Sequence, residues 1–141
     1  MPVAAGPYED GKAAADWGDY ETALQKWLPL AEQGNAEAQF MLGNLYREGL
    51  GVPLSDTKAV TWYWLAADEG HAHAQLSLGI MYATGRGVTQ DIVLAHMWFE
   101  LAAAQGNRDA LSNLKRADDQ MTPEQVAEAQ RLARKWKPKG E

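Results

Sequence analysis

The 141-residue sequence contains no cysteine, which excludes disulfide bonds and cysteine-ligated metal sites. It also lacks any apolar run near the roughly 20 residues that cross a bilayer, so we expect no membrane span. No intact signal peptide is present, because the first residues have neither a basic start nor a long apolar stretch. Residues 2–6 fit the remnant of a removed signal, which would make the protein periplasmic or secreted, and equally a plain terminus of a cytoplasmic protein.

A basic surface is missing as well. The net charge is −6, and successive quarters of the chain carry −4, −3, −1 and +2. A general nucleic-acid binder needs a basic face, so we expect no nucleic-acid partner. The basic residues near residue 135 suit the negative end of a helix dipole.

Enough apolar residues remain to form a core. They make up 46% of the sequence, and 141 residues suit one domain spanning 1–141.

Two stretches of the chain repeat each other. Residues 35–70 and 71–106 align without a gap and are identical at 15 of 36 positions. A fixed period of this length is typical of stacked helical repeats.

Each unit is predicted to be a helix, a loop and a helix. In the first unit an i, i+4, i+8 stripe of Ala38, Leu42 and Tyr46 marks the first helix, and Trp62 lies on the apolar stripe of the second. Predicted caps and helix-ending glycines recur every 36 residues. The caps are Asp19, Ser55 and Asp91, and the glycines are Gly34, Gly70 and Gly106.

Gly43 and Gly79 occupy one register inside the first helices. Glycine destabilises a helix interior by about 1 kcal/mol relative to alanine, so a close helix crossing is expected there. The alanine pairs 66–67 and 102–103 are the expected partners.

The two ends fit the pattern less well. Residues 8–34 are predicted to form a degenerate first hairpin, and residues 107–137 a C-terminal capping hairpin. Thr122, Pro123 and Gln125 form a capping-box pattern at the start of its second helix. The fold class is therefore all-α, with about four antiparallel helical hairpins.

The segments "AEAQFMLGNLYREGLGVPLSDTKAVTWYWLAADEG" and "AHAQLSLGIMYATGRGVTQDIVLAHMWFELAAAQG" resemble Sel1-like repeats, which are related to tetratricopeptide repeats. The resemblance implies a right-handed α/α superhelix, or solenoid, whose first helices line a concave face. It also implies an adaptor role, often in bacteria. The fourth unit departs from the pattern, because Lys115 replaces the helix glycine and Asp118 the tyrosine.

No catalytic or cofactor motif emerges. The Gly-x-Gly-Val loops lack the lysine and the preceding strand of a phosphate-binding loop. His71 and His73 point about 200° apart on a helix, and His96 is interpreted as a surface residue, so no metal site is expected. We therefore expect neither an enzyme nor a bound cofactor.

Partner binding is expected on side chains that flank the predicted core positions. For Phe40, Leu76 and Ile80 packing between hairpins explains the pattern equally well. Trp64 is either a cover over the junction with the preceding hairpin or an exposed anchor. The predicted set is Gln39, Phe40, Asn44, Arg47, Trp64, Gln75, Leu76, Ile80, Leu111 and Ser112.

Two functions remain open on these grounds. The first is a scaffold that binds a protein or peptide partner in its concave face. The second is self-association into a homo-oligomer through apolar positions such as Trp64.

Overall fold

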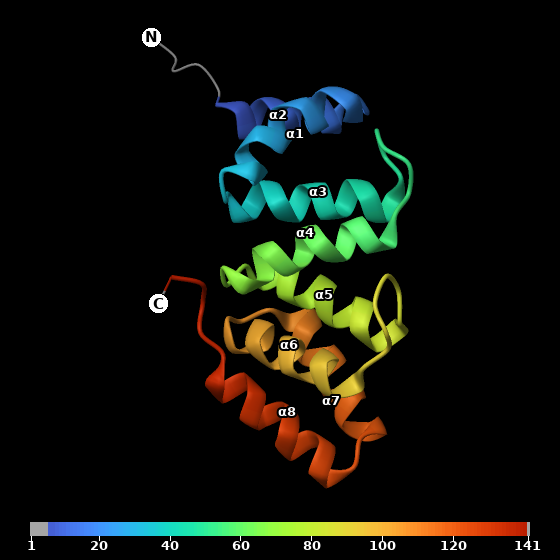
Figure 1. Ribbon diagram of the computed structural model, residues 1–141, viewed down its shortest axis with the longest axis vertical. Helices are drawn as coiled ribbons and strands as arrows, with labels where there is room; N and C mark the ends of the chain where they lie inside the picture. The colour runs from blue at the N-terminus through green and yellow to red at the C-terminus, as the bar shows by residue number, and fades with distance from the viewer. Residues whose placement is uncertain (1–5, 141) are drawn as a thin grey trace.

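The computed structural model describes residues 6–140, which form eight α-helices and no strand (Figure 1). The interpretation of residues 2–6 as a signal remnant falls almost wholly outside this range. The helices are α1 (Pro7–Asp16), α2 (Tyr20–Glu32), α3 (Ala36–Glu48), α4 (Asp56–Asp68), α5 (Ala72–Thr84), α6 (Ile92–Ala104), α7 (Arg108–Gln120) and α8 (Pro123–Lys135).

The helices begin where the capping signals place them. Asp19, Ser55 and Asp91 each accept a hydrogen bond from the backbone N–H three residues later. Asn35 and Asn107 cap α3 and α7 in the same way. These bonds satisfy donors that the first helical turn leaves unpaired, which is why the predicted helix starts are confirmed.

The second helices end at the predicted glycines. Gly34, Gly70 and Gly106 have φ angles of +96°, +97° and +94°. A side chain would strain the backbone at each of these positions, so the 36-residue spacing of glycine follows from the geometry.

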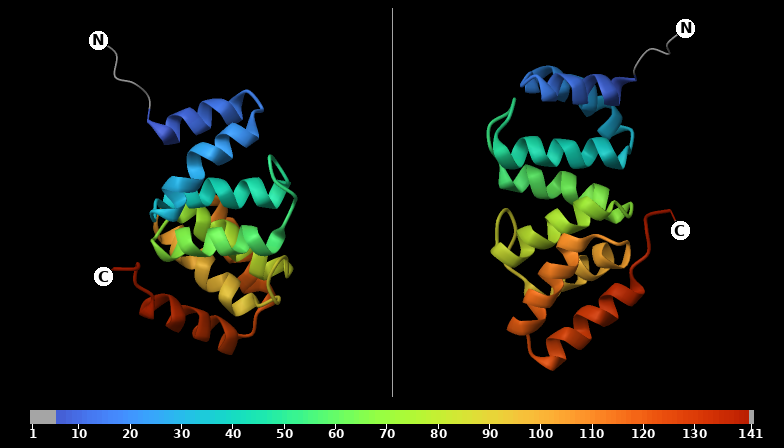
Figure 2. Two further views of the ribbon diagram at one scale, coloured as in Figure 1. Left: turned by 45° about the horizontal axis from the view of Figure 1, so that its top comes forward. Right: turned by 180° about the vertical axis from the view of Figure 1, so that it is seen from behind.

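The helices pack in sequence order along the long axis of the molecule (Figures 1 and 2). Helix pairs α1–α2, α3–α4 and α5–α6 form hairpins, and α2–α3, α4–α5 and α6–α7 join one unit to the next. The predicted all-α solenoid is confirmed.

Close approach occurs at the two helix glycines, but the expected partner is wrong. A β-carbon at Gly43 would lie 2.5 Å from the Tyr63 ring, and one at Gly79 would lie 2.6 Å from the Phe99 ring. The glycines therefore admit an aromatic ring from the second helix of the hairpin. The alanine pairs 66–67 and 102–103 are not the contact.

The closing hairpin departs from its predicted packing. Both of its helices are present, and Thr122 and Gln125 form the expected capping box. However, α8 packs against α6 rather than alongside α7. Figure 1 shows α8 running obliquely across the end of the stack, with the chain after it turning back toward α4.

The repeated tryptophans meet different neighbours. Trp98 is buried, and its ring lies 6.1 Å from that of Trp136 in an edge-on arrangement. Trp62 is only partly buried and packs on the cluster that contains Trp27 and Leu42. Trp98 therefore lies in the core, whereas Trp62, on the corresponding apolar stripe, keeps an accessible side.

Candidate functional site

Two residues of the predicted binding set are buried amides that join hairpins. Gln39 is 4% exposed and Gln75 is fully buried. The side-chain Nε2 of Gln39 donates to the carbonyl of Ala31 at 3.1 Å, and that of Gln75 to Ala67 at 3.2 Å. A charge introduced at either of these buried positions should therefore destabilise the fold.

A second group of predicted residues packs between helices. The Phe40 ring stacks on His71 with 4.9 Å between centroids, and Asn44 accepts a hydrogen bond from the Tyr63 hydroxyl. Leu76 and Ile80 pack partly buried against the cluster that contains Phe99. Packing between hairpins thus accounts for Phe40 and Leu76, while Ile80 also lines a groove described below.

The remaining predicted residues reach solvent. Arg47 pairs with the neighbouring Glu48 at 3.0 Å, and Ser112 is exposed on α7. Trp64 and Leu111 are each 45% exposed, although both are large and apolar. Nearly half of the Trp64 surface is therefore open to solvent.

A groove of about 430 Å³ lies between α5, α6 and α7. Its apolar lining includes Ile80, Ile92 and Phe99, and its polar lining includes Asn113 and Arg116. Of the predicted set, this groove contains only Ile80.

A second hollow, of about 290 Å³, lies beside the second helices α2 and α4. Trp62, Leu65 and Ala31 supply its apolar lining, and Gln39 lines it from α3. Three acidic residues and one lysine also line this hollow, which we call the Trp62 pocket. It is lined by Ala31, Glu32, Gly34, Gln39, Trp62, Leu65, Asp68, Glu69 and Lys139.

Three successive first helices are joined at their N-terminal ends by Glu37. Its Oε1 accepts from the Tyr8 hydroxyl at 3.0 Å, and its Oε2 lies 2.6 Å from His71 Nε2. Because His71 Nδ1 accepts from the Ala74 N–H as a helix cap, the His71 ring proton lies on Nε2 and is donated to Glu37.

This network changes the acidity of two groups. Partial burial by itself would raise the pKa of Glu37, but the hydrogen bonds from His71 and Tyr8 outweigh it and lower that pKa. Burial, together with the bond to Glu37, raises the pKa of Tyr8 to about 12. Glu37 is therefore held as a carboxylate that organises the N-terminal ends of α1, α3 and α5.

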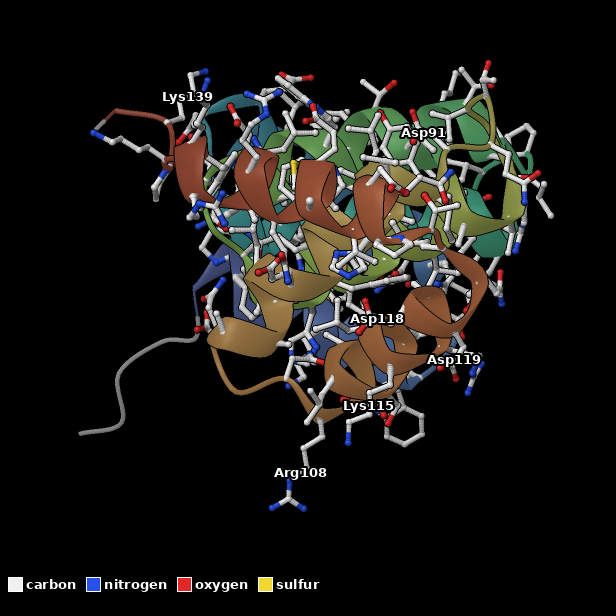
Figure 3. The ribbon with its side chains drawn as sticks, turned by 90° about the horizontal axis from the view of Figure 1, so that it is seen from below. Asp91, Arg108, Lys115, Asp118, Asp119 and Lys139 are labelled. Carbon is white, nitrogen blue, oxygen red and sulfur yellow. The ribbon has the colours of Figure 1, made fainter. Side chains whose placement is uncertain are left out.

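His96 is buried, which corrects its interpretation as a surface residue. It is 2% exposed, its Nε2 lies 2.6 Å from Asp118 Oδ1, and its Nδ1 has no hydrogen-bond partner. Burial also raises the pKa of nearby Glu100. Figure 3 shows Asp118 directed toward the centre of the molecule, while Arg108 and Lys115 project away from it. The pair joins α6 to α7 and leaves the Asp118 side chain half exposed.

Within residues 6–140, no group of three or more His, Asp or Glu side chains is placed to hold a metal ion. Over the same range, none of the helices has the length and apolar character of a membrane span.

The sequence interpretation missed the Trp62 pocket and the capping role of His71. Both leave a signal in the repeat. His71 occupies the register of Asn35 and Asn107, which cap α3 and α7. The pocket coincides with a position where the repeats differ, since Glu69 stands where the next unit has Gln105.

Known proteins share this architecture. The structure of a protective antigen from uropathogenic Escherichia coli, described as having an SLR fold, is 28% identical with a TM-score of 0.89. The alignment covers 92% of this chain and 29% of that one. A Sel1 repeat protein from Oxalobacter formigenes is 34% identical with a TM-score of 0.73, over 76% of this chain and 44% of that one.

The chain thus spans less than half the length of either structure. No curated protein matched the sequence. The family model for the Sel1 repeat matches residues 36–71 and 72–107, which together make up half of the chain. These are the two units whose caps, glycines and aromatic contacts recur at 36 residues. The chain belongs to the Sel1 repeat family.

Proposed function

We propose that this chain is a protein-interaction scaffold that binds a peptide or helix of a partner protein in the groove between α5 and α7. The observation that carries the proposal is the groove itself. It combines an apolar floor, formed by Ile80 and Phe99, with polar groups from Asn113 and Arg116. Such a mixture suits a partner segment that buries apolar side chains and is oriented by hydrogen bonds.

The family supports the same conclusion. Sel1 repeats form non-catalytic scaffolds that commonly bind proteins. A solenoid presents extended surfaces between successive helices, and those surfaces are the usual binding sites of repeat proteins.

Selection from a random peptide library on the full chain tests the groove. Ala83→Arg fills the groove and Arg116→Glu reverses a charge in its lining, so each should weaken the selected peptides about tenfold or more. Arg108→Glu is the matched control, because Arg108 lies on the same helix and points into solvent (Figure 3). Selected peptides that bind both groove variants with unchanged affinity would reject this site.

Self-association is a second candidate, favoured by the exposure of Trp64. A half-exposed tryptophan on a helix surface is suited to contact a second copy. Light scattering over a concentration series should then show a mass above 15.5 kDa that falls when Trp64→Gln is introduced. A monomer at every concentration would eliminate this candidate.

A further inference from the structure

The Trp62 pocket has a structural equivalent one repeat further along the chain. Residues 36 positions later recreate its apolar lining, with Ala67 for Ala31, Trp98 for Trp62 and Leu101 for Leu65. The two places share backbone geometry and these side chains. The chain segment that covers one of them therefore indicates what kind of segment could bind to the other.

The equivalent place is covered by the chain's own segment 136–140. The Trp136 ring meets the Trp98 ring edge-on at 6.1 Å, and both Trp136 and Pro138 lie 3.9 Å from where a Gly70 β-carbon would be. The Lys139 N–H donates to the Asp68 carbonyl at 2.8 Å. An extended segment with an aromatic side chain, a proline and lysines therefore fits this type of surface.

The Trp62 pocket itself is open. Apart from its chain neighbours, no atom lies within 4 Å of a β-carbon position at Gly34, the counterpart of Gly70. Segment 136–140 reaches only its edge, through Lys139. The hollow of about 290 Å³ is the space that an aromatic side chain fills at the equivalent place.

One buried atom of a residue that lines the pocket lacks a partner. The Oε1 of Gln39 is buried and accepts no hydrogen bond, although its Nε2 is bonded to Ala31. In the next repeat, the equivalent Oε1 of Gln75 accepts from Gln105 Nε2 at 2.9 Å. Position 69 carries a glutamate instead, which has no side-chain amide to donate. A buried acceptor left in this state destabilises the protein, so the pocket is suited to a ligand that brings a donor.

The charge around the pocket indicates the kind of donor. Glu32, Asp68 and Glu69 line the pocket, and Lys139 is the one base among its lining residues. Positively charged groups are favoured beside such a rim.

We propose that the Trp62 pocket binds an extended segment of a partner protein in which an aromatic side chain stands beside lysine or arginine. The aromatic ring packs on Trp62 and Leu65, a donor satisfies Gln39 Oε1, and the basic side chains pair with the acidic rim. This inference does not depend on the α5–α7 groove, because the two surfaces share no lining residue.

The probe is a labelled peptide with the sequence RKWKPKG, which corresponds to residues 134–140. Titrated with the full chain and followed by fluorescence anisotropy, it should bind at one site, and replacing its tryptophan by alanine should abolish binding. The double variant Glu32→Lys/Glu69→Lys should weaken binding about tenfold or more. The charge-matched control Asp16→Lys/Asp119→Lys, at two exposed positions outside the pocket, should bind normally. Equal weakening by both double variants would show that net charge alone weakens binding. That result would overturn the proposal.

Glu69→Gln is the sharper variant. It restores the residue type of Gln105, whose amide satisfies the equivalent acceptor, so it should raise the unfolding midpoint and weaken the peptide severalfold. Tighter or unchanged binding to this variant would contradict the role given to Gln39.

NMR spectra of the ¹⁵N-labelled chain show where the peptide binds. Peptide binding should shift the NMR signals of the Gly34 amide and the Gln39 side-chain amide and leave the signal of Gly70 unchanged. Shifts centred on Gly70 would mean that the peptide only displaces segment 136–140. Shifts at Gly34 that grow with protein concentration alone would make a second copy the occupant. Either result overturns the proposal.

Discussion

The two buried glutamines, Gln39 and Gln75, occupy the same place in successive repeats. Each amide donates to a carbonyl of the preceding hairpin, which couples neighbouring units. Their identity across the repeats is visible in the sequence, but their burial is not. Polar residues on a helix are mostly exposed, so the sequence interpretation placed them on an accessible face. Only coordinates reveal that the carbonyl at the end of the previous helix lies within reach.

The Gln75→Ala substitution should therefore lower the free energy of unfolding. It removes the bond to the Ala67 carbonyl and the bond from Gln105, and it leaves space at a fully buried position. We expect a loss of about 1–3 kcal/mol in urea denaturation. Exposed Gln130→Ala should change stability by less than about 0.5 kcal/mol. Similar values for the two variants would show that the buried amide contributes nothing specific.

At Gly43 and Gly79 the close approach of a second helix could be predicted, but the contacting residue could not. Their shared register correctly predicts a close approach, because only a missing side chain gives room for it. The contacting positions hold Tyr63 in one unit and Phe99 in the other. Because these two residues are not identical, the prediction favoured the identical alanine pairs instead. Each hairpin thus keeps the same internal contact, between a glycine and an aromatic ring, although the aromatic residue differs.

At the scale of the helix, the starts and ends of these elements could be predicted well. Capping side chains and left-handed glycines act within a few residues, so local sequence is enough to locate them. The packing partner of α8 could not be predicted, because a capping box defines where a helix begins and carries no information about its neighbour. The apolar stripe of α8 packs against α6.

The N-terminal ends of α1, α3 and α5 depend on one carboxylate, which leads to a pH prediction. The pKa of Glu37 in the folded chain lies below its ordinary value of 4.5. Its contribution to stability is therefore present above that value and is lost as pH falls through the lower folded pKa. Because the side chain is half exposed, we expect it to be worth about 1 kcal/mol or less.

Chemical denaturation of the wild type and Glu37→Gln between pH 7 and pH 3 measures this contribution. The wild type should be more stable at neutral pH, and the difference should shrink toward zero in acid. Exposed Glu21→Gln serves as the control and should show a smaller difference at neutral pH. A Glu37 difference that is constant across the range would contradict the proposed carboxylate network.

For the molecule as a whole, the unusual feature is that the chain folds back on its own stack. After α8, the segment reaches Asp68 on α4, and Trp136 packs on Trp98. Residues 1–70 carry a net charge of −7 and residues 71–141 a net charge of +1. The basic final segment thus lies against the more acidic part of the array.

This fold-back should make the later repeats more stable than the first hairpin. Trp136→Ala removes the ring that covers Trp98, so amides of α6 and α8 should exchange with solvent faster in hydrogen-exchange measurements. Amides of α1 and α2, which the segment does not cover, should keep their rates. Lys137→Ala, at an exposed neighbour, is the control. A uniform change over all helices would show that the ring stabilises the molecule only globally.

The overall architecture could be predicted because one period repeats in residues that carry the packing. The candidate sites could be predicted only in part, because binding surfaces arise where the repeats differ. Glu69 against Gln105 and Trp64 against Glu100 are such differences, and their meaning depends on which neighbours lie within reach.

The glycine loops have a further consequence for how such a chain could lengthen. A β-carbon at Gly51 would lie 2.8 Å from the Tyr20 backbone, and one at Gly87 would lie 2.5 Å from that of Asp56. Each loop thereby packs against the start of the preceding second helix, and it sets the distance between successive hairpins. Duplication of a whole 36-residue unit preserves this spacing, whereas a longer loop would change the pitch of the entire superhelix.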